Sequence, residues 1–319
     1  LAAVARDREV QRMLFDAGLA GVCVPRQYGG QALTPAHQRV LNEEIAGFEF
    51  ASRIQVPTFA PCAAVLLEFG TEEQKQRHIP AMLKGEEIWM QFLSEPSGGS
   101  DVAGALTTAV RDGDDWILNG SKVWTTGAWF SDYGLCLLRT NWDVPKHRGL
   151  SVFIIKIHQP GVELHRIEMI DGSREFCQEF MTDVRVPDSD RIGEVDQGWS
   201  VGTRWMFHER NAVGGGSPYV SGPPHLSEVT AGGDPLFALA RRTGQLGDRW
   251  VRDMLGEAYT LQRAQTELVR HLGEGMAAGV LPDTTAAIMR LMSGVVAVRR
   301  STIAMEIAGE SVAATAPDD

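Results

Sequence analysis

A loop rich in glycine and serine, SEPSGGSD at residues 94–101, holds the first group of residues whose types suggest binding chemistry. Because glycine has no side chain and serine carries a hydroxyl, such a loop can bring backbone amides and hydroxyls close to a phosphate or a flat ring. The same composition is typical of loops that bind nothing, and by itself it favours that structural interpretation. The neighbouring segments decide between the two.

A strand-like segment, WILNGSKVWTTGA at residues 116–128, contains a second group of candidate binding residues, Trp124 and Thr126. The indole of Trp124 could cover one face of a flat heterocycle, and a threonine hydroxyl could hydrogen-bond to heteroatoms of the ring. The simpler alternative places Trp124 in the core of a β domain. Taken together, the two groups favour a site for a planar ligand.

The elements that must position these residues fall into three zones, of which the first is helical. Thr34 followed by Pro35 is a helix start signal, because it pairs an N-cap residue with proline at the first helical position. Thr71 and Gln74 form a capping box before a second helix. The sequence therefore predicts an N-terminal helical domain at residues 1–89.

The second zone, residues 90–195, has the period of β-strands. Short runs of Val, Ile, Trp and Thr are separated by the pairs Asp112-Gly113 and Asn119-Gly120, which are strong signals for hairpin turns. Strand-length apolar segments follow them. The sequence predicts a compact β-barrel or sandwich here as the central domain.

The third zone, residues 196–319, returns to long amphipathic helical segments, with Asp234 as one start signal. It predicts a C-terminal helical bundle, and the whole chain is expected to have an α+β fold of helices, barrel and bundle. The chain begins at Leu1 rather than methionine and stops at Asp319. We therefore expect the bundle to be truncated.

The composition excludes several classes of partner. The net charge of −11 over 319 residues argues against nucleic acids and anionic membranes, because both attract basic surfaces. An anionic small molecule is still compatible, since a few arginines suffice to make a local positive site. No run approaches the roughly 18 to 20 apolar residues of a membrane span. We expect no signal peptide and no metal site.

The four cysteines, Cys23, Cys62, Cys136 and Cys177, are widely spaced and form no CxxC pair. This spacing predicts buried free thiols in a reducing cytosol rather than a disulfide framework. We accordingly expect a cytoplasmic protein.

Five segments, in the same order along about residues 15 to 210, resemble the acyl-CoA dehydrogenase family of flavoproteins. The loop LSEPSGGSD is similar to the family's threonine-glutamate-proline loop, with Ser94 in place of the usual threonine. The segment around Trp124 is similar to the strand pair whose end meets the flavin. The other three are VPRQYGG, GTEEQKQRHIPAMLKGE and RVPDSDRIGEVDQGW.

The resemblance implies FAD as the cofactor and an acyl-CoA thioester as the substrate. By position, Leu93 and Ser94 would contact the pyrimidine edge of the isoalloxazine ring. Ser100 would lie near the FAD pyrophosphate and the CoA portion of the substrate. Trp124 would stack over the flavin, and Thr126 would hydrogen-bond near its N5 atom.

The implied reaction is α,β-dehydrogenation, in which a carboxylate removes the α-proton while the β-hydrogen leaves as hydride to flavin N5. The family places this base either near the C-terminus, beyond Asp319 in this chain, or just before an arginine early in the first bundle helix. Glu209 and Arg210 match the second position. Glu209 is the expected base, with an ordinary surface glutamate as the alternative, and Arg210 would be structural or directed towards CoA.

Two segments depart from the family, which usually receives adenosine-side contacts from a neighbouring subunit. Arg249 falls about where one glutamine is expected, and Glu306 and Glu310 replace a glutamine and a glycine. Negative charge beside a pyrophosphate weakens binding unless it is compensated. Two arrangements follow: a homo-oligomer with altered adenosine contacts, which we favour slightly, or a hetero-oligomer whose unlike subunits divide the FAD contacts and the base.

Rival functions use the same fold, because function belongs to the site rather than to the fold. One is a flavin monooxygenase or nitroalkane-oxidase-like enzyme, against which Glu209 argues, since an oxygenase needs no α-proton base. Another is a non-catalytic partner subunit, against which the intact flavin-facing segments argue. The resemblance also implies an electron-transferring flavoprotein as the electron acceptor.

Overall fold

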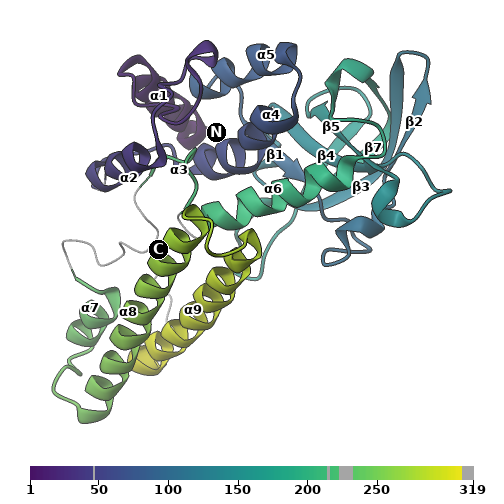
Figure 1. The fold of residues 1–319 in the computed structure, drawn as a ribbon. Coiled ribbons are helices and arrows are strands. Elements are labelled where there is room, and N and C mark those ends of the chain that lie inside the picture. The colour runs from purple at the N-terminus through teal and green to yellow at the C-terminus, as the bar shows by residue number, and fades with distance from the viewer. Residues whose placement is uncertain (46, 214–215, 223–232, 311–319) are drawn as a thin grey trace. The chain divides into compact units, whose positions relative to one another are not determined.

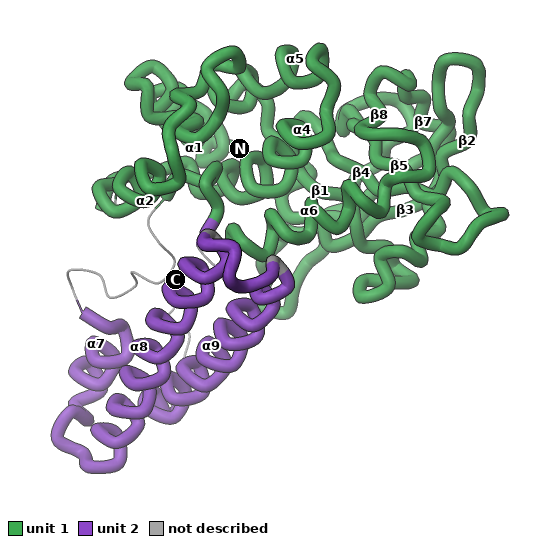
Figure 2. The backbone as a smooth tube through the Cα atoms, viewed as in Figure 1, with its two compact units in different colours: residues 1–212, 217–223 green, residues 213–216, 224–319 purple. Residues whose placement is uncertain are grey.

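The computed structural model describes residues 1–45, 47–213, 216–222 and 233–310. The chain forms two compact units, one of residues 1–212 with 217–223 and one of residues 213–216 with 224–319 (Figure 2). The first unit contains the N-terminal helices, the whole sheet and α6, whereas the second contains α7 to α9. The α+β architecture predicted from the sequence is confirmed. The division into three domains at residues 89 and 195 stays a prediction.

The helices of the first unit begin where local capping signals place them. The side chain of Thr34 caps α2 and that of Thr71 caps α5, each in a capping box, so both predicted start signals are confirmed. The helices are α1 (Ala2–Asp16), α2 (Pro35–Glu44), α3 (Ser52–Ile54), the π-helix η2 (Gln55–Ala63), α4 (Ala64–Phe69), α5 (Glu72–Leu83) and α6 (Gly198–Val213).

The strands form one eight-stranded sheet in the order β6-β7-β3-β2-β4-β5-β8, with β1 paired to β4 in parallel (Figure 1). The middle of the order is joined only by the pair Thr108 and Arg139, between β2 and β4. The strands are β1 (Trp89–Phe92), β2 (Thr108–Asp112), β3 (Asp115–Thr126), β4 (Tyr133–Arg139), β5 (Leu150–Lys156), β6 (Val162–Arg166), β7 (Phe176–Pro187) and β8 (Arg191–Ile192).

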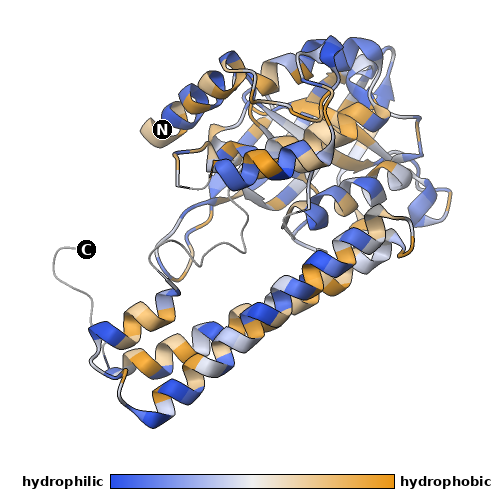
Figure 3. Cartoon of the chain, turned by 60° about the vertical axis from the view of Figure 1, so that its left-hand side comes forward, coloured by the Kyte–Doolittle hydropathy of each residue, from blue (hydrophilic) through white to orange (hydrophobic). Residues whose placement is uncertain are grey.

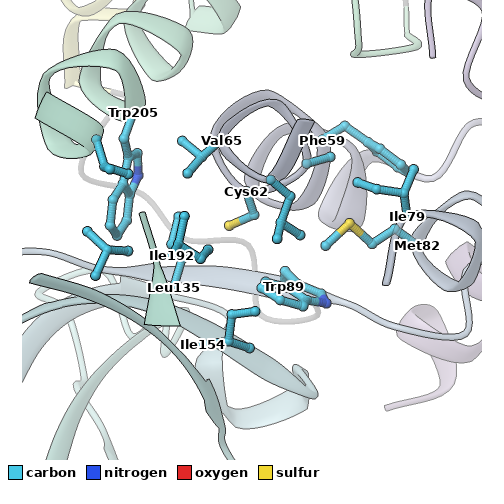
Figure 4. Packing of buried hydrophobic residues seen from close by; sticks show 14 of the residues in the cluster. Phe59, Cys62, Val65, Ile79, Met82, Trp89, Leu135, Ile154, Ile192 and Trp205 are labelled. Atoms are coloured by element: carbon cyan, nitrogen blue, oxygen red, sulfur yellow. The ribbon is translucent and has the colours of Figure 1, made fainter. Parts of the chain in front are cut away.

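Nearly every residue of strands β4 and β5 is buried. Successive side chains point to opposite sides of a strand, so both faces of these strands are covered. Leu135 and Leu137 pack against helices, while Cys136 and Leu138 pack among the strands β3 and β7. The sheet therefore curves round one core and carries a second core on its outer face. Figure 4 shows this second core, to which η2, α5 and α6 contribute Cys62, Met82 and Trp205 among others.

One predicted turn is wrong. Asn119-Gly120 was expected to end a strand at a hairpin, yet β3 runs through it and only Asp112-Gly113 lies at a turn. The reason is the long partner β7, which pairs with β3 on both sides of a register shift at this point. Gly120 has φ +146°, and a Cβ there would lie 2.6 Å from the side chain of Thr107. Glycine is therefore needed here for a bulge and a close approach.

The second unit consists of α7 (Pro235–Arg242), α8 (Arg249–Ala277) and α9 (Ala286–Ala308). As predicted, Asp234 caps α7, and its carboxylate also accepts a hydrogen bond of 2.8 Å from Arg300. Hydrophobic and hydrophilic residues alternate along these helices (Figure 3), and the core includes Leu255, Ile303 and Ile307. No helix among the described residues is both long and apolar enough to cross a membrane.

Candidate active site

The loop after β1 and the end of β3 lie side by side, as the sequence led us to expect. The backbone N–H of Val123 donates a hydrogen bond of 2.9 Å to the carbonyl oxygen of Ser94. Further along, the hydroxyl of Thr125 lies 3.5 Å from the carbonyl oxygen of Gln91. These contacts bring Ser94 next to Trp124, although the two are 30 positions apart in the sequence.

Trp124 adopts a backbone conformation that is rare for a tryptophan, with φ +66°. It sits at the register shift where β3 bulges against β7, and its side chain is 54% exposed. The indole touches only the edge of Phe176 among aromatic rings of the described chain, with ring centroids 5.9 Å apart. The alternative of a core tryptophan is therefore wrong. Bulges and left-handed non-glycine residues are frequent at functional sites.

Three hydroxyls in the loop after β1 and at the end of β3 have no partner among the residues that the structure describes. They belong to Ser94, which is half-buried, and to Ser100 and Thr126, which are exposed. An exposed indole face beside unpaired hydroxyls can accept a flat ring that carries polar atoms on its edge. The side chains of Ser94, Trp124 and Thr126 are thus of the chemical types that a flat ring such as the isoalloxazine requires.

A buried ion pair that sequence reasoning did not single out fixes the loop. Lys122 is fully buried, and its ammonium group lies 2.8 Å from Glu95 and 2.6 Å from the carbonyl oxygen of Leu137. Glu95 also accepts hydrogen bonds from the backbone N–H groups of Leu106 and Thr107. Burial alone would raise the pKa of the Glu95 carboxyl, but Lys122 and these donors hold the pKa below its usual value.

A signal for this pair was present in the sequence. Lys122 stands in phase with the buried residues Trp116 and Leu118 of the same strand, so the period of two places it on the inner face. A lysine on such a face needs a buried acidic partner. Glu95, in the loop quoted first, is that partner.

The far part of the same loop lies at the surface. Asp101 forms an exposed ion pair of 2.7 Å with Lys146, and Lys146 holds the pKa of the Asp101 carboxyl below its usual value. A small hollow between Leu93 and Asp101 is lined by Ser97 and Gly98. Ser100 lies next to this hollow in the chain.

Helix α6 carries Glu209 on its sheet-facing side. The indole N–H of Trp205 donates a hydrogen bond of 2.6 Å to the side-chain oxygen of Gln91, and Glu209 follows one turn later on the same side of the helix. Burial raises the pKa of the Cys62 thiol, and the Glu209 carboxylate raises it further. The thiol of Cys62 lies 3.5 Å from the carbonyl oxygen of Met90, so the Glu209 carboxylate acts on a thiol that contacts β1.

The strand end with Thr126 reaches the same neighbourhood from β3. A Cβ on Gly127 would lie 2.9 Å from the terminal methyl of Met90, so residue 127 packs directly on β1. Cys62, on which Glu209 acts electrostatically, contacts the carbonyl oxygen of Met90, whereas Gly127 packs on the side chain of Met90. That Glu209 and Thr126 belong to one site stays a prediction.

The residues next to Glu209 form a separate polar cluster. Glu68 of α4 lies 2.8 Å from Arg204 and 2.7 Å from His208, and the pKa of the Glu68 carboxyl is lowered chiefly by Arg204. His208 is thus engaged with Glu68. Arg210 is exposed, with its guanidinium 3.9 Å from the sulfur of Met206.

A second residue that sequence reasoning missed is Glu179 on β7. Its side chain is fully buried, and its Oε2 atom lies at hydrogen-bond distance, 3.0 Å, from the hydroxyl oxygen of Thr125. Burial raises the pKa of Glu179 to about 8. The signal was again the period of two, because Glu179 stands in phase with the buried Cys177 and Met181.

In the second unit, one departure from the family pattern is partly compensated. Glu306 lies 3.6 Å from Arg299, which also pairs with Glu257 at 2.6 Å. Arg249 is the first residue of α8 and is exposed, as is Glu310.

All four cysteines are free thiols, as predicted, and three of them are buried, while Cys23 is half-buried.

The sequence matches two family models. Residues 2–86 match the N-terminal domain of acyl-CoA dehydrogenase, and residues 91–184 match its middle domain. Among curated relatives, Acyl-CoA dehydrogenase FadE34 of Mycobacterium tuberculosis is 34% identical over 286 residues, which are 88% of this chain and 38% of FadE34. Acyl-CoA dehydrogenase IpdE1 of the same organism is 33% identical, over 85% of this chain and 68% of IpdE1.

A solved structure described as the Tcur3481-Tcur3483 steroid ACAD has the same fold. It is 29% identical with a TM-score of 0.83, and the alignment covers 98% of this chain and 78% of that one. Structural and sequence similarity therefore extend over the same helices and strands that hold the site. On this evidence the chain belongs to the acyl-CoA dehydrogenase family.

Proposed function

We propose that this chain is part of an FAD-dependent acyl-CoA dehydrogenase, which converts an acyl-CoA thioester to the enoyl-CoA. One observation carries the proposal most directly. The half-exposed indole of Trp124 lies beside the unpaired hydroxyls of Ser94 and Thr126, and the Glu209 carboxylate on α6 acts on the thiol of Cys62, which contacts β1. A flat cofactor and a carboxylate base are the two components that this oxidation requires.

The roles of the binding residues follow from where they lie. Trp124 would cover one face of the isoalloxazine, and Thr126 would hydrogen-bond near N5. Leu93 and Ser94 would contact the pyrimidine edge, since they adjoin the end of β3. Ser100, exposed near the surface hollow, would bind close to the pyrophosphate and CoA.

Glu209 would remove the α-proton of the thioester. FAD, when bound, supplies the acceptor for the β-hydrogen, which leaves as hydride to N5. Closure of the site by substrate would exclude water and strengthen the hydrogen bonds that polarise the thioester carbonyl. Arg210, exposed on the next position of α6, would attract the anionic CoA portion.

The test is the visible absorption spectrum of the purified protein before and after anaerobic addition of a panel of acyl-CoA compounds. We expect a flavin band that bleaches with at least one member of the panel. The variant Glu209→Gln should retain the band and lose bleaching, whereas Glu43→Gln, at an exposed helical glutamate, should behave as wild type. Unchanged bleaching in Glu209→Gln would show that the base lies elsewhere.

A second candidate is a subunit of a hetero-oligomeric acyl-CoA dehydrogenase that acts on steroid acyl-CoA. It is supported by the steroid ACAD described above, whose name joins two designations, and by Glu306 in the segment expected to meet the adenosine. If it is correct, the chain purified alone should be colourless and should acquire flavin only when a partner chain is co-expressed. A homo-oligomer would be yellow without a partner.

Turnover would require an acceptor for the two electrons that are removed from the substrate. We propose an electron-transferring flavoprotein as the acceptor, as the family resemblance implies. Reduction of that protein by substrate in the presence of this enzyme, monitored by its own flavin absorbance, tests the assignment. Oxidation by molecular oxygen at the same rate would favour an oxidase instead.

A further inference from the structure

Glu179 is a buried acid that the proposed chemistry does not use. Its side chain is fully buried in the middle of β7, and one carboxyl oxygen, Oε1, has no hydrogen-bond partner among the described residues. No cation of the described chain lies within 4.0 Å of it. A buried carboxylate without an ion pair and with one bare oxygen is unfavourable, whereas a neutral carboxylic acid is tolerated far better.

The hydrogen bonds around Thr125 also indicate a neutral acid. The hydroxyl of Thr125 has a single hydrogen but two oxygen neighbours, Glu179 Oε2 at 3.0 Å and the carbonyl oxygen of Gln91 at 3.5 Å. If Glu179 keeps its proton, it donates to Thr125 Oγ1, and Thr125 is free to donate to Gln91. Both contacts are then hydrogen bonds.

We propose that Glu179 is a positioning residue, a neutral acid that holds Thr125 and thereby the strand end on either side of it. The inference rests on the proposed function, because the residues on either side are Trp124 and Thr126. Thr125 points inward and is buried, while both of its neighbours point outward, as the alternation of a strand requires.

The backbone at this point needs such an anchor. Trp124 occupies the left-handed region, which a bulky side chain leaves unless the surrounding structure holds it there. The register of β3 and β7 shifts between Val123 and Thr125, so part of the regular backbone pairing is interrupted. The Glu179–Thr125 hydrogen bond crosses the same two strands at the shift and replaces that lost restraint.

The same hydrogen-bond network extends to helix α6. Gln91 lies at its centre, with its carbonyl oxygen facing Thr125 and its side-chain oxygen accepting a hydrogen bond of 2.6 Å from Trp205. Trp205 is fully buried, and Glu209 lies one turn further along α6. Glu179 is therefore connected to the strand end through Thr125. It is connected to the helix of the proposed base through Thr125, Gln91 and Trp205.

The charged and titratable groups that face Glu179 come from several strands. The ammonium of Lys122 on β3 favours the ionised form, but it is bound to Glu95. The charge of Glu179 would also raise the pKa of the thiols of Cys136 and Cys177. Burial outweighs these influences and raises the pKa of Glu179 to about 8. Ionisation above that pH removes the proton that Glu179 donates to Thr125.

The test uses the full chain, with FAD and without it, as wild type and as four variants. Glu179→Gln keeps a neutral donor to Thr125, whereas Glu179→Leu and Thr125→Val abolish the hydrogen bond. Glu163→Gln, at an exposed glutamate on β6, is the matched control. The readouts are the dissociation constant for FAD and the indole N–H signals of Trp124 and Trp205 in nuclear magnetic resonance spectra, assigned with Trp→Phe variants.

We expect Glu179→Leu and Thr125→Val to weaken FAD binding about tenfold and to shift both indole signals. Glu179→Gln should restore both readouts to within a factor of three of wild type. In wild type the Trp124 signal should titrate as the pH passes about 8, and in Glu179→Gln it should not. The proposal is wrong if Glu179→Gln behaves like Glu179→Leu, or if neither variant differs from Glu163→Gln.

The two proposals fail in different ways. If wild type binds no FAD and no acyl-CoA reduces it, the proposed function is wrong. The indole signals of the cofactor-free protein still show in that case whether Glu179 holds Trp124. If substrate reduces the flavin of wild type but the indole signals are the same in the Glu179 variants as in wild type, the function stands and the positioning role is wrong.

Discussion

The indole nitrogen of Trp205 lies 2.6 Å from the side-chain oxygen of Gln91, and this hydrogen bond ties helix α6 to strand β1. Gln91 immediately follows Met90, whose carbonyl oxygen contacts the thiol of Cys62 and whose side chain packs on Gly127. Because Trp205 and Glu209 are one helical turn apart, the bond sets how closely the proposed base approaches the proposed flavin contact.

The variant Trp205→Phe should separate this positioning from packing. It keeps an aromatic ring in the core but leaves the oxygen of Gln91 without its donor, so we expect a loss of about 1–2 kcal/mol in the free energy of unfolding. Flavin reduction by substrate should slow at least tenfold while FAD affinity changes little. Urea unfolding and stopped-flow absorbance measure the two effects, and Trp250→Phe, at an exposed tryptophan, is the control.

The buried Lys122–Glu95 pair should be costly to break on one side. We expect Lys122→Met to lower the free energy of unfolding by about 3–5 kcal/mol, because it leaves Glu95 charged and unpaired in the interior. Lys122→Met with Glu95→Gln should recover part of the loss. Arg174→Met, which breaks an exposed ion pair with Glu168, should change stability by only about 0.5 kcal/mol. Equal effects of the two single variants would contradict the assigned burial.

The free energy of unfolding should vary with pH because Glu179 binds a proton more tightly in the folded state than in the unfolded state. The pKa of Glu179 is about 8 in the folded protein, against 4.5 for an ordinary glutamate. Between these values the folded state binds the extra proton, so stability contributed by this group falls as the pH rises and reaches its minimum above about 8. The difference should reach about 5 kcal/mol.

Glu179→Gln removes this titration. The free energy of unfolding of wild type minus that of Glu179→Gln should therefore decrease from pH 5 to pH 8.5, measured in denaturant at each pH. Other titrating groups cancel in the difference. A difference that does not change with pH would show that Glu179 is ionised in the folded state.

Because the backbone of Trp124 is left-handed, glycine should be more stable than alanine at this position, the reverse of the usual order in a strand. At an ordinary strand position glycine is less stable than alanine, but here Trp124→Gly should be more stable than Trp124→Ala by about 1–2 kcal/mol, since alanine is strained at φ +66°. Both variants should bind FAD at least tenfold more weakly than wild type. Thermal unfolding of the cofactor-free proteins compares the pair, and alanine as the more stable variant would contradict the conformation.

Much of the site could be predicted from the sequence because its signals are local. The segments around Ser94 and Trp124 were expected to meet, and the hydrogen bond between Val123 and Ser94 joins them. The position of Glu209 on the first bundle helix was also expected, and that helix is α6. What could not be predicted was that α6 packs with the sheet in the first compact unit.

The roles of Lys122 and Glu179 were missed for a physical reason. Charged residues usually lie at the surface, so Lys122 and Glu179 are expected to be exposed until the strand register is known. Their burial depends on which face of β3 and β7 is turned inward, and on partners 27 and 54 positions away. Asn119-Gly120 was misjudged for the same reason, since pairing with β7 overrides its local preference for a turn.

The sequence by itself determined the order of helices, strands and helices, and the starts of α2, α5 and α7. Capping residues and the hydrophobic period act within a few positions and need no distant partner. Only the tertiary structure decided that Trp124 is exposed and that Lys122 and Glu179 are buried. Burial and ionisation at these positions depend on contacts between strands far apart in the chain, which exist only after the sheet has formed.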